Sequence, residues 1–282
     1  MESHISKRLK EIEDLPPVPR TLQEVFHSFD SITTSAKTLE EIIKKDPVLT
    51  AKVLKMANSP YYGVHGEINS ISKAIVLLGF DEIRNLVIGL TVTATFSRQF
   101  KIKNFSTNDL WLHSIGVAYC SKMLGERCDG MDPDELFTIG LIHDLGRFLM
   151  PFYFVKELEQ AVSMSEQMGI GLIEAEERLG ISHAEIGAFL AILWQLSDLV
   201  VSTIRYHHHP KGAGQHSRTA SVIYVADQLV QKIGQGWNLD YKNTKLFVPK
   251  LLGLHATDIK AIARELKKNM KSIKDSWSTI LD

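Results

Sequence analysis

The sequence predicts an all-α protein. Apolar residues recur at intervals of three and four positions along nearly the whole chain, which is typical of helices with one buried face. Gly and Pro stand between these periodic segments rather than inside them, and clear strand signatures, with alternating apolar and polar residues, are missing. The 282 residues are 44% hydrophobic and 23% charged, so the chain can bury a sizeable core.

The N-terminal third predicts a layer of short helices. A polar helix is expected over residues 3–13, followed by a proline-rich connector and a helix near residues 22–29. Thr38 and Glu41 match the capping-box pattern, in which two side chains bond backbone N–H groups at the start of a helix. This pattern predicts that the next helix begins at Thr38.

Asp46 and Pro47 predict the end of that helix and the start of another. Asp accepts hydrogen bonds from free N–H groups at a helix start, and Pro fits the first helical position. A breaker cluster at residues 58–60 ends this helix, and two more helices are expected over residues 71–78 and 81–98.

A polar, irregular stretch over residues 99–108 is the predicted boundary between two domains. We expect an N-terminal helical subdomain over residues 1–105 and a helical core with C-terminal helices over residues 106–282. Helices of the second part are expected near residues 109–127, 133–143, 151–168, 171–178, 182–195, 197–208, 217–234, 245–252 and 257–275.

Composition excludes several classes of protein. The formal net charge is −1, which argues against a dedicated binder of nucleic acid or anionic membranes. The helix predicted after Pro47 carries only Lys52 and Lys55 as basic residues, too few to favour a DNA-reading helix. We therefore expect no nucleic-acid partner.

Two cysteines, Cys120 and Cys128, form no disulfide framework and are typical of a reduced compartment. The N-terminus has no apolar signal-peptide core, and no run of about 18 apolar residues exists. We expect a cytoplasmic protein without membrane attachment.

Histidines and aspartates interrupt apolar helix faces in the second part of the chain. His113 lies on an apolar face, the pair His143 and Asp144 ends an apolar helix, and Asp227 lies inside an apolar stripe. Burying a carboxylate in such a place is costly without a partner cation. Further histidines with helix-start or helix-end positions are His183, His207 and His208.

Each of these residues also has a structural explanation. A lone inward histidine is usually a satisfied core residue, His207 and His208 could complement a helix dipole, and Asp227 could pair with an arginine. Considered together, the residues favour a mixed imidazole and carboxylate metal site. Such a ligand set suits iron, zinc, manganese or nickel, as one or two ions, rather than calcium.

The order His113, His143-Asp144 and Asp227 resembles the H…HD…D signature of the HD phosphohydrolase superfamily. The resemblance implies that these four residues bind metal. It also implies that His183, His207 and His208 match the extra ligands of binuclear members such as the HD-GYP phosphodiesterases, in which the residue at Asp144 would bridge two metals.

Four N-terminal motifs resemble the HDOD branch of this superfamily. They are Leu15-Pro-Pro-Val-Pro19, Asp46-Pro47-Val-Leu, Ala57-Asn58-Ser59-Pro-Tyr-Tyr-Gly63 and Ala74-Ile-Val-Leu-Leu-Gly79. With the metal residues, the resemblance covers roughly residues 10 to 230. It implies an HD-type helical core with an N-terminal helical subdomain, and a signalling output module that acts through partner proteins.

Two departures separate the chain from the HD-GYP enzymes. Arg147 stands where they have Lys, and the GYP motif is missing after the histidine pair. The resemblance therefore does not imply cleavage of cyclic di-GMP. We expect a signal-transduction or regulatory module with a retained metal site. The alternative is a metal-dependent phosphohydrolase or phosphodiesterase acting on a nucleotide or cyclic dinucleotide, with Asp144 and Arg147 as catalytic residues and Arg147 on a substrate phosphate.

Overall fold

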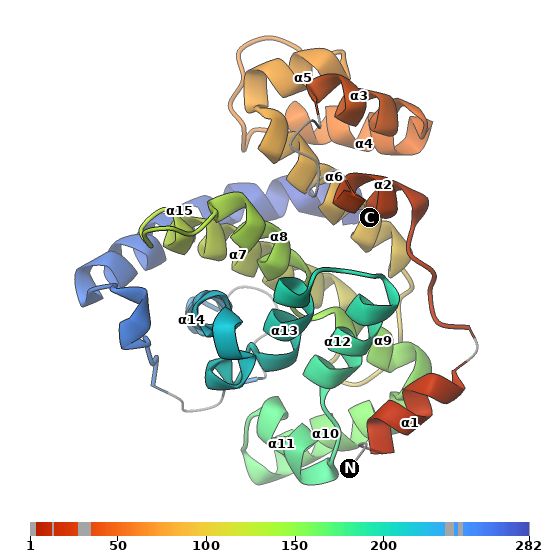
Figure 1. Ribbon diagram of the computed structural model, residues 1–282, viewed down its shortest axis with the longest axis vertical. Helices are drawn as coiled ribbons and strands as arrows, with labels where there is room; N and C mark the ends of the chain where they lie inside the picture. The colour runs from red at the N-terminus through yellow and green to blue at the C-terminus, as the bar shows by residue number, and fades with distance from the viewer. Residues whose placement is uncertain (1–3, 13, 28–34, 235–239, 242–244, 282) are drawn as a thin grey trace. The chain divides into compact units, whose positions relative to one another are not determined.

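The regular structure is helical throughout the described residues of the computed structural model, with no strand among them, as the sequence predicts (Figure 1). These residues are 4–12, 14–27, 35–234, 240–241 and 245–281. The α-helices are α1 (His4–Glu11), α2 (Arg20–His27), α3 (Ala36–Lys44), α4 (Pro47–Ala57), α5 (Ile71–Leu78), α6 (Phe80–Thr95), α7 (Thr107–Gly125), α8 (Pro133–Ile142), α9 (Leu145–Tyr153), α10 (Val155–Met168), α11 (Leu172–Leu179), α12 (His183–Leu193), α13 (Asp198–Tyr206), α14 (Ser217–Lys232) and α15 (Ala256–Leu281). Two short 3-10 helices, η1 (Pro210–His216) and η2 (Lys250–Leu252), precede α14 and α15.

The chain forms two compact units, and each unit is discontinuous in sequence. Unit 1 comprises Met1–Leu15 and Arg98–Lys267, and unit 2 comprises Pro16–Ser97 and Lys268–Asp282. The helix α15 therefore contributes residues to both. The predicted domains, residues 1–105 and 106–282, stay a prediction.

Polar side chains begin several helices. The Asp46 carboxylate accepts the backbone N–H groups of Val48 and Leu49 at the start of α4, as predicted. The capping box predicted at Thr38 is wrong, because α3 begins earlier and the Ser35 hydroxyl accepts the Thr38 N–H. Thr38 thus lies in the first turn of α3 rather than at its cap.

The single helix predicted over residues 151–168 is two helices. Pro151 lies within α9, and the chain breaks at Phe154, which has φ −132° and ψ 37°, before α10 begins. The prediction placed Pro151 at a helix start, where proline is favoured. Here the proline instead removes a backbone donor near the end of α9, which helps to end that helix.

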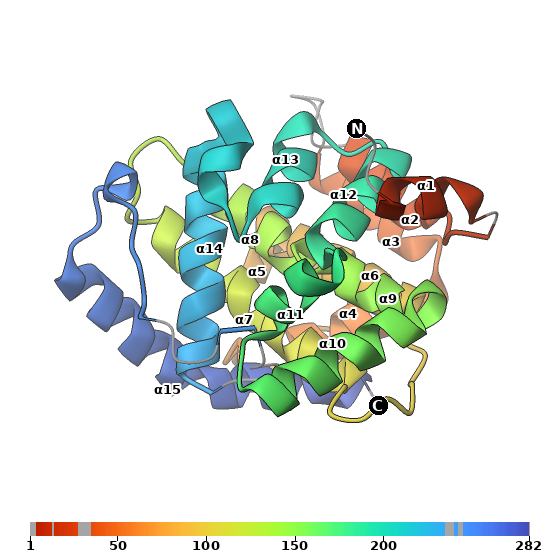
Figure 2. The same cartoon turned by 90° about the horizontal axis from the view of Figure 1, so that it is seen from below.

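Unit 1 is built on two sets of packed helices. The helix α7 packs against α8 and α14, and α12 packs against α9 and α13 (Figure 2). The chains of α9 and α12 approach closely at Gly146, where a Cβ atom would lie 1.8 Å from the backbone oxygen of His183. Only glycine permits this approach, which brings the start of α12 against the start of α9.

Unit 2 packs α3, α4, α5 and α6 around apolar side chains. Asn58 fixes the loop after α4, because its side chain accepts the Ile68 N–H at 2.8 Å and donates to the Ile68 carbonyl at 2.7 Å. Trp277, from the end of α15, is fully buried. The breaker cluster after α4 therefore ends the helix and also anchors the following loop.

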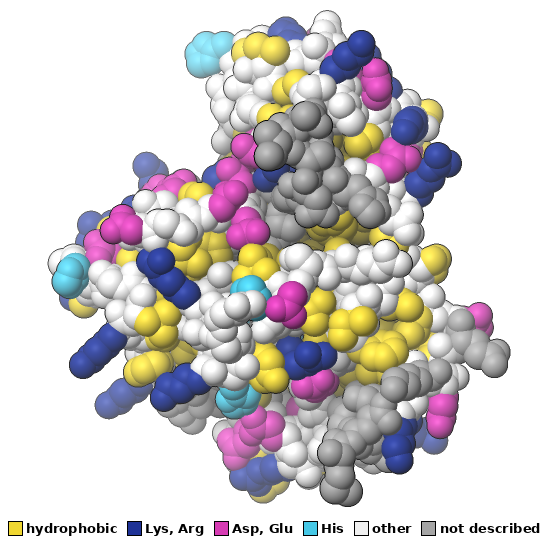
Figure 3. Space-filling model, in the orientation of Figure 1, with side chains coloured by type: hydrophobic (Ala, Val, Ile, Leu, Met, Phe, Trp, Pro, Cys, Tyr) yellow, Lys and Arg dark blue, Asp and Glu magenta, His cyan; other side chains and the backbone are white. Residues whose placement is uncertain are grey.

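Surface charge is mixed. Lys and Arg side chains alternate with Asp and Glu on the face shown in Figure 3, in agreement with the net charge of −1. No helix in the described part of the chain is both long and apolar enough to span a bilayer.

Candidate metal centre

The seven predicted metal residues lie together inside unit 1, in two neighbouring groups. One group is His113, His143 and Asp227, and the other is Asp144, His183, His207 and His208; within each, one ligand atom per residue lies within 4.8 Å of the others. The residues come from α7, the junction of α8 with α9, the start of α12, the end of α13, and α14. The structure thus brings every one of these predicted residues to one place.

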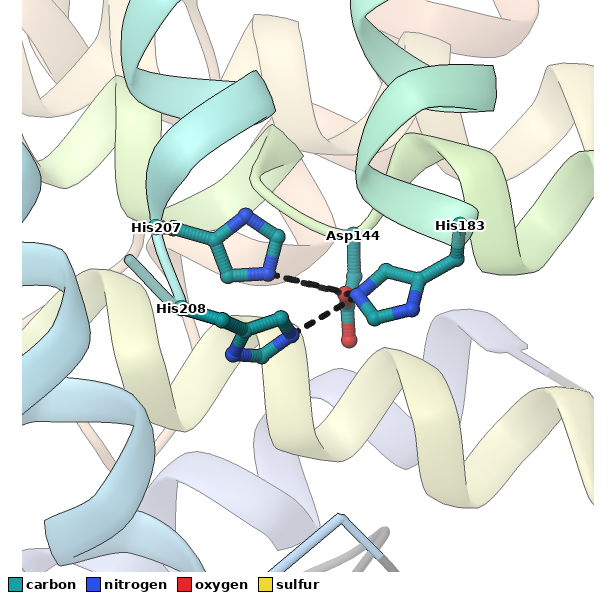
Figure 4. A group of neighbouring side chains, drawn as sticks. All are labelled: Asp144, His183, His207 and His208. Carbon is teal, nitrogen blue, oxygen red and sulfur yellow. Dashed lines mark hydrogen bonds and ion pairs between the residues drawn. The ribbon is translucent and has the colours of Figure 1, made fainter. Parts of the chain in front are cut away.

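The Asp144 carboxylate lies between the two groups. Its Oδ2 is 3.5 Å from His143 Nε2, and its Oδ1 is 3.3 Å from His183 Nε2 and 3.7 Å from His207 Nε2. Figure 4 shows the imidazoles of His183, His207 and His208 directed toward this carboxylate. In the other group, His113 Nε2 lies 3.1 Å from Asp227 Oδ1.

Four of the five histidines use Nδ1 to hold an outward partner. His143 Nδ1 donates to the Gly140 carbonyl at 2.7 Å, and His207 Nδ1 donates to the Ile204 carbonyl at 2.6 Å. Since a carbonyl can only accept, the Nδ1 atom must carry the proton and Nε2 keeps its lone pair. Metal-binding histidines are oriented by such outer hydrogen bonds.

Side chains orient the other two histidines. His183 Nδ1 donates to Glu176 Oε2 at 2.6 Å. The Tyr241 hydroxyl donates to Asp227 Oδ2 at 2.9 Å, which leaves its oxygen to accept from His208 Nδ1 at 2.8 Å. The Nε2 atoms of all four histidines consequently face the interior of the cluster.

The donor atoms of the cluster fit a metal ion, and two of them have no hydrogen bond to any described residue. Within the described chain, neither His143 Nε2 nor Asp144 Oδ1 has a hydrogen-bond partner, although both atoms are buried. A buried polar atom without a partner is costly, and a coordinated cation removes that cost. Imidazole nitrogens with carboxylate oxygens are the donors that transition-metal ions prefer.

Burial sets the protonation of the cluster. Burial lowers the pKa of His207, and His143 and His183 lower it further, to about 3. Burial likewise lowers the pKa of His143 and brings the pKa of His208 well below its usual range. These three imidazoles are therefore neutral at neutral pH and need not lose a proton before binding metal.

Two other pKa values are governed by opposite charge. Burial would lower the pKa of His113, but the Asp227 carboxylate raises it above its ordinary value. Burial would raise the pKa of Asp144, but the histidines His143 and His183 and the Arg147 guanidinium hold it well below its ordinary value. Asp144 is thus an ionised carboxylate at neutral pH.

Arg147 is fully buried beside the cluster. Its Nη1 lies 2.5 Å from Glu176 Oε1, its Nη2 pairs with Asp240 Oδ1, and its Nε lies 3.9 Å from Asp144 Oδ2. The role as a phosphate-binding residue predicted from the sequence stays a prediction. In the structure, the guanidinium contacts carboxylates of the protein itself.

Sequence reasoning missed the outer residues of the site: Glu176, Gln231, Asp240 and Tyr241. Glu176 lies on α11, a short helix rich in acidic residues, where one more glutamate gives no signal. Asp240 and Tyr241 fall in a polar segment that predicts only a loop. No sequence pattern indicates that these residues contact Arg147 or the histidines.

Known proteins resemble this chain along most of its length. A sequence model of the HDOD domain matches residues 15–210. An uncharacterised protein of Treponema pallidum (strain Nichols) is 24% identical over 223 residues, which are 78% of this chain and 43% of that protein. The chain thus spans less than half the length of this curated relative.

Three solved structures share the helical fold. An HDOD domain protein of unknown function from Geobacter sulfurreducens has a TM-score of 0.76 and 26% identity, with 98% of this chain and 97% of that chain covered. A protein from Shewanella amazonensis SB2B, named as a candidate phosphohydrolase, has a TM-score of 0.73 and 27% identity, with 96% of both chains covered. A candidate signal transduction protein from Marinobacter aquaeolei VT8 has a TM-score of 0.82 and 23% identity, with 99% of this chain and 62% of that chain covered.

Proposed function

This chain belongs to the HDOD family, and from that premise we propose that it is a signal-transduction or regulatory module organised around a retained metal centre. The observation that carries the proposal is the convergence of Nε2 lone pairs and carboxylate oxygens in one buried cluster. His113, His143, Asp144, His183, His207, His208 and Asp227 would hold one or two ions of iron, zinc, manganese or nickel.

Burial favours a module over an enzyme. Six of the seven side chains expose at most 1% of their surface, and the His208 side chain exposes 6%. A substrate must reach a metal through an open coordination position, whereas closed sites organise structure. In a module, the metal would hold five helix segments together and so set the shape that partner proteins recognise.

Partners of this module would be signalling proteins, and the compartment would be the cytoplasm. Both cysteines, Cys120 and Cys128, are buried and unlinked, and burial raises the pKa of the Cys120 thiol far above its ordinary value. Such thiols behave as small apolar residues in a reducing environment.

The metal content of the protein tests the centre directly. Protein purified without a histidine tag or chelator should contain roughly one or two equivalents of transition metal by elemental analysis. The double variant His143→Ala and Asp144→Ala should lose it. Less than about a tenth of an equivalent in the wild type, even after reloading with each metal, would contradict the proposed centre.

A second candidate function is a metal-dependent phosphohydrolase or phosphodiesterase. The position of Asp144, with one oxygen near His143 and the other near His183, favours it, because a carboxylate so placed can join two metal ions. Bound metal would supply a Lewis acid and an activated water for attack on phosphorus. The likeness to the candidate phosphohydrolase of Shewanella amazonensis also favours this function.

Turnover separates the two functions. The fully metallated protein is incubated with cyclic dinucleotides, nucleotides and model phosphodiesters, and product is followed by chromatography. The module predicts no turnover at any metal loading. An enzyme predicts that the wild type forms product and that Asp144→Asn forms none. The metal content of Asp144→Asn is measured in parallel.

A further inference from the structure

The histidines of the metal centre differ in what holds their Nδ1 atoms. His143 and His207 are held by backbone carbonyls of their own helices, Gly140 and Ile204, which any sequence would supply. His183 is instead held by a side chain, Glu176, from a different helix. The orientation of His183 therefore depends on where that glutamate lies.

Glu176 makes a double contact with the start of α12. Its Oε2 accepts both His183 Nδ1 at 2.6 Å and the His183 backbone N–H at 3.1 Å. The carboxylate thus accepts from Nδ1 of His183, which directs Nε2 to the cluster.

Arg147 fixes Glu176 from the other side. The guanidinium binds Glu176 Oε1 at 2.5 Å and also pairs with Asp240. Asp240 is in turn held by Gln231, whose Nε2 lies 3.2 Å from Asp240 Oδ2 and 2.9 Å from Asp227 Oδ1. A buried cation paired on several sides is fixed in place, since moving it would leave charges unpaired.

We propose that Glu176, anchored by Arg147, is the positioning residue for the metal held by Asp144, His183, His207 and His208. This inference rests on the proposed metal centre and assigns to it a residue that does not touch the metal. The expected consequence is selective: loss of Glu176 weakens the four-residue group, while His113, His143 and Asp227 keep their own metal. Loss of such an outer carboxylate typically weakens metal binding by about 10- to 100-fold.

The test compares Glu176→Gln with Glu177→Gln. Glu177 is the neighbouring glutamate, also lies beside a histidine, with Oε1 at 3.1 Å from His209 Nε2, and has a side chain 55% exposed outside the cluster. Glu176→Gln keeps the size of the side chain. Its amide has only one acceptor oxygen, so it must present an N–H group either to His183 or to Arg147. Binding of Zn²⁺ and Co²⁺ is titrated, with Co²⁺ absorption as the spectroscopic readout.

In the wild type and Glu177→Gln, two equivalents should bind. In Glu176→Gln, one equivalent should keep its affinity and the other should weaken by about 10- to 100-fold, with a changed Co²⁺ spectrum. Arg147→Lys, which keeps the charge but cannot span both carboxylates, should shift binding in the same direction by a smaller factor and serves if Glu176→Gln does not fold.

A measurement without metal separates this inference from the proposed function. In ¹⁵N-histidine NMR of the metal-free wild type, His183 should be protonated at Nδ1, and Glu176→Gln should change that signal. A wild type that binds no metal overturns the metal centre and this inference with it. A wild type that binds one or two equivalents, together with a folded Glu176→Gln of unchanged affinities and unchanged His183 signal, overturns the positioning role alone.

Discussion

His183 and His208 bring their Nε2 atoms within 2.9 Å of each other in the interior of unit 1. Both Nδ1 atoms are occupied by outward partners, Glu176 and Tyr241, so the two Nε2 atoms face each other. Two facing lone pairs repel unless a cation lies between or beside them. A proton or a metal ion shared by the two nitrogens would remove this repulsion.

Metal should stabilise the folded protein. Because the cluster exists only in the folded chain, loading with a metal at 100 times its Kd should add about 2.7 kcal/mol to the free energy of unfolding, and a chelator should remove this gain. Thermal unfolding with and without metal measures it. The double variant His143→Ala and Asp144→Ala, if folded by circular dichroism, should show no shift. An equal shift in that variant would place the metal elsewhere.

Replacement of Asp144 by Asn should reduce metal binding at both groups. The amide keeps the shape of the carboxylate but removes the negative charge that lies between His143 and His183. Elemental analysis after reloading should show a loss of both equivalents, whereas Asp109→Asn, at an exposed position on α7, should bind as the wild type does. Full loading of Asp144→Asn would contradict a shared carboxylate.

The contact of α9 with α12 should tolerate no added methyl group. A Cβ atom at Gly146 would lie 1.8 Å from the His183 backbone oxygen, while one at Gly187 would lie 2.9 Å from the Gly146 nitrogen. We expect Gly146→Ala to lower the free energy of unfolding more than Gly187→Ala does, with each loss about 1–3 kcal/mol or above. Urea unfolding of the two variants checks this order. A reversed order would mean that the helices separate more easily at Gly146.

The ion pair of Arg8 with Glu157 should give unit 1 a pH-dependent increment of stability. Burial would raise the pKa of Glu157, but the hydrogen bond from Arg8 lowers it below its unfolded value. The increment is then present above the unfolded pKa and is lost as the pH falls through the folded pKa. Since the two side chains are 35% and 23% exposed, solvent screens the pair and the increment is small.

Glu157→Gln should therefore have a free energy of unfolding about 0.2–1 kcal/mol lower than that of the wild type at pH 7. The two should converge as the pH falls through the folded pKa of Glu157, and urea unfolding at a series of pH values measures this. Glu159→Gln, an exposed neighbour on α10, should match the wild type at every pH. A difference that grows toward low pH would have the wrong sign and would rule out this ion pair as its source.

Helix existence was predictable from local signals, and some boundaries were not. The cap at Asp46 acts within a few residues, so the sequence shows it directly. The Ser182 hydroxyl begins α12 in the same way, because it accepts the Glu185 N–H. The break at Phe154 between α9 and α10 carries no glycine and no cap. Tertiary packing sets the helix boundary at this position, whereas the apolar periodicity of the sequence continues through it.

The metal residues were predictable because each interrupts an apolar helix face, where a polar side chain is conspicuous. Their outer partners were not predictable, because Glu176 and Asp240 lie among other polar residues in the sequence. Only the ion pairs with Arg147 in the folded structure connect them to the site. Long-range pairing of this kind joins residues 29 and 93 positions apart in the chain. Sequence periodicity contains no information about such distances.

The division of the chain into two discontinuous units bears on the order of folding. Unit 2 draws on residues 16–97 and again on residues 268–282, and unit 1 uses residues on both sides of the first of these segments. During synthesis, α2 to α6 emerge long before the end of α15, whose Trp277 is fully buried. Neither unit can complete its core until this last helix is made, and contacts between such distant segments close slowly. The helices of residues 16–97 therefore complete their core only after residues 268–282 have been made.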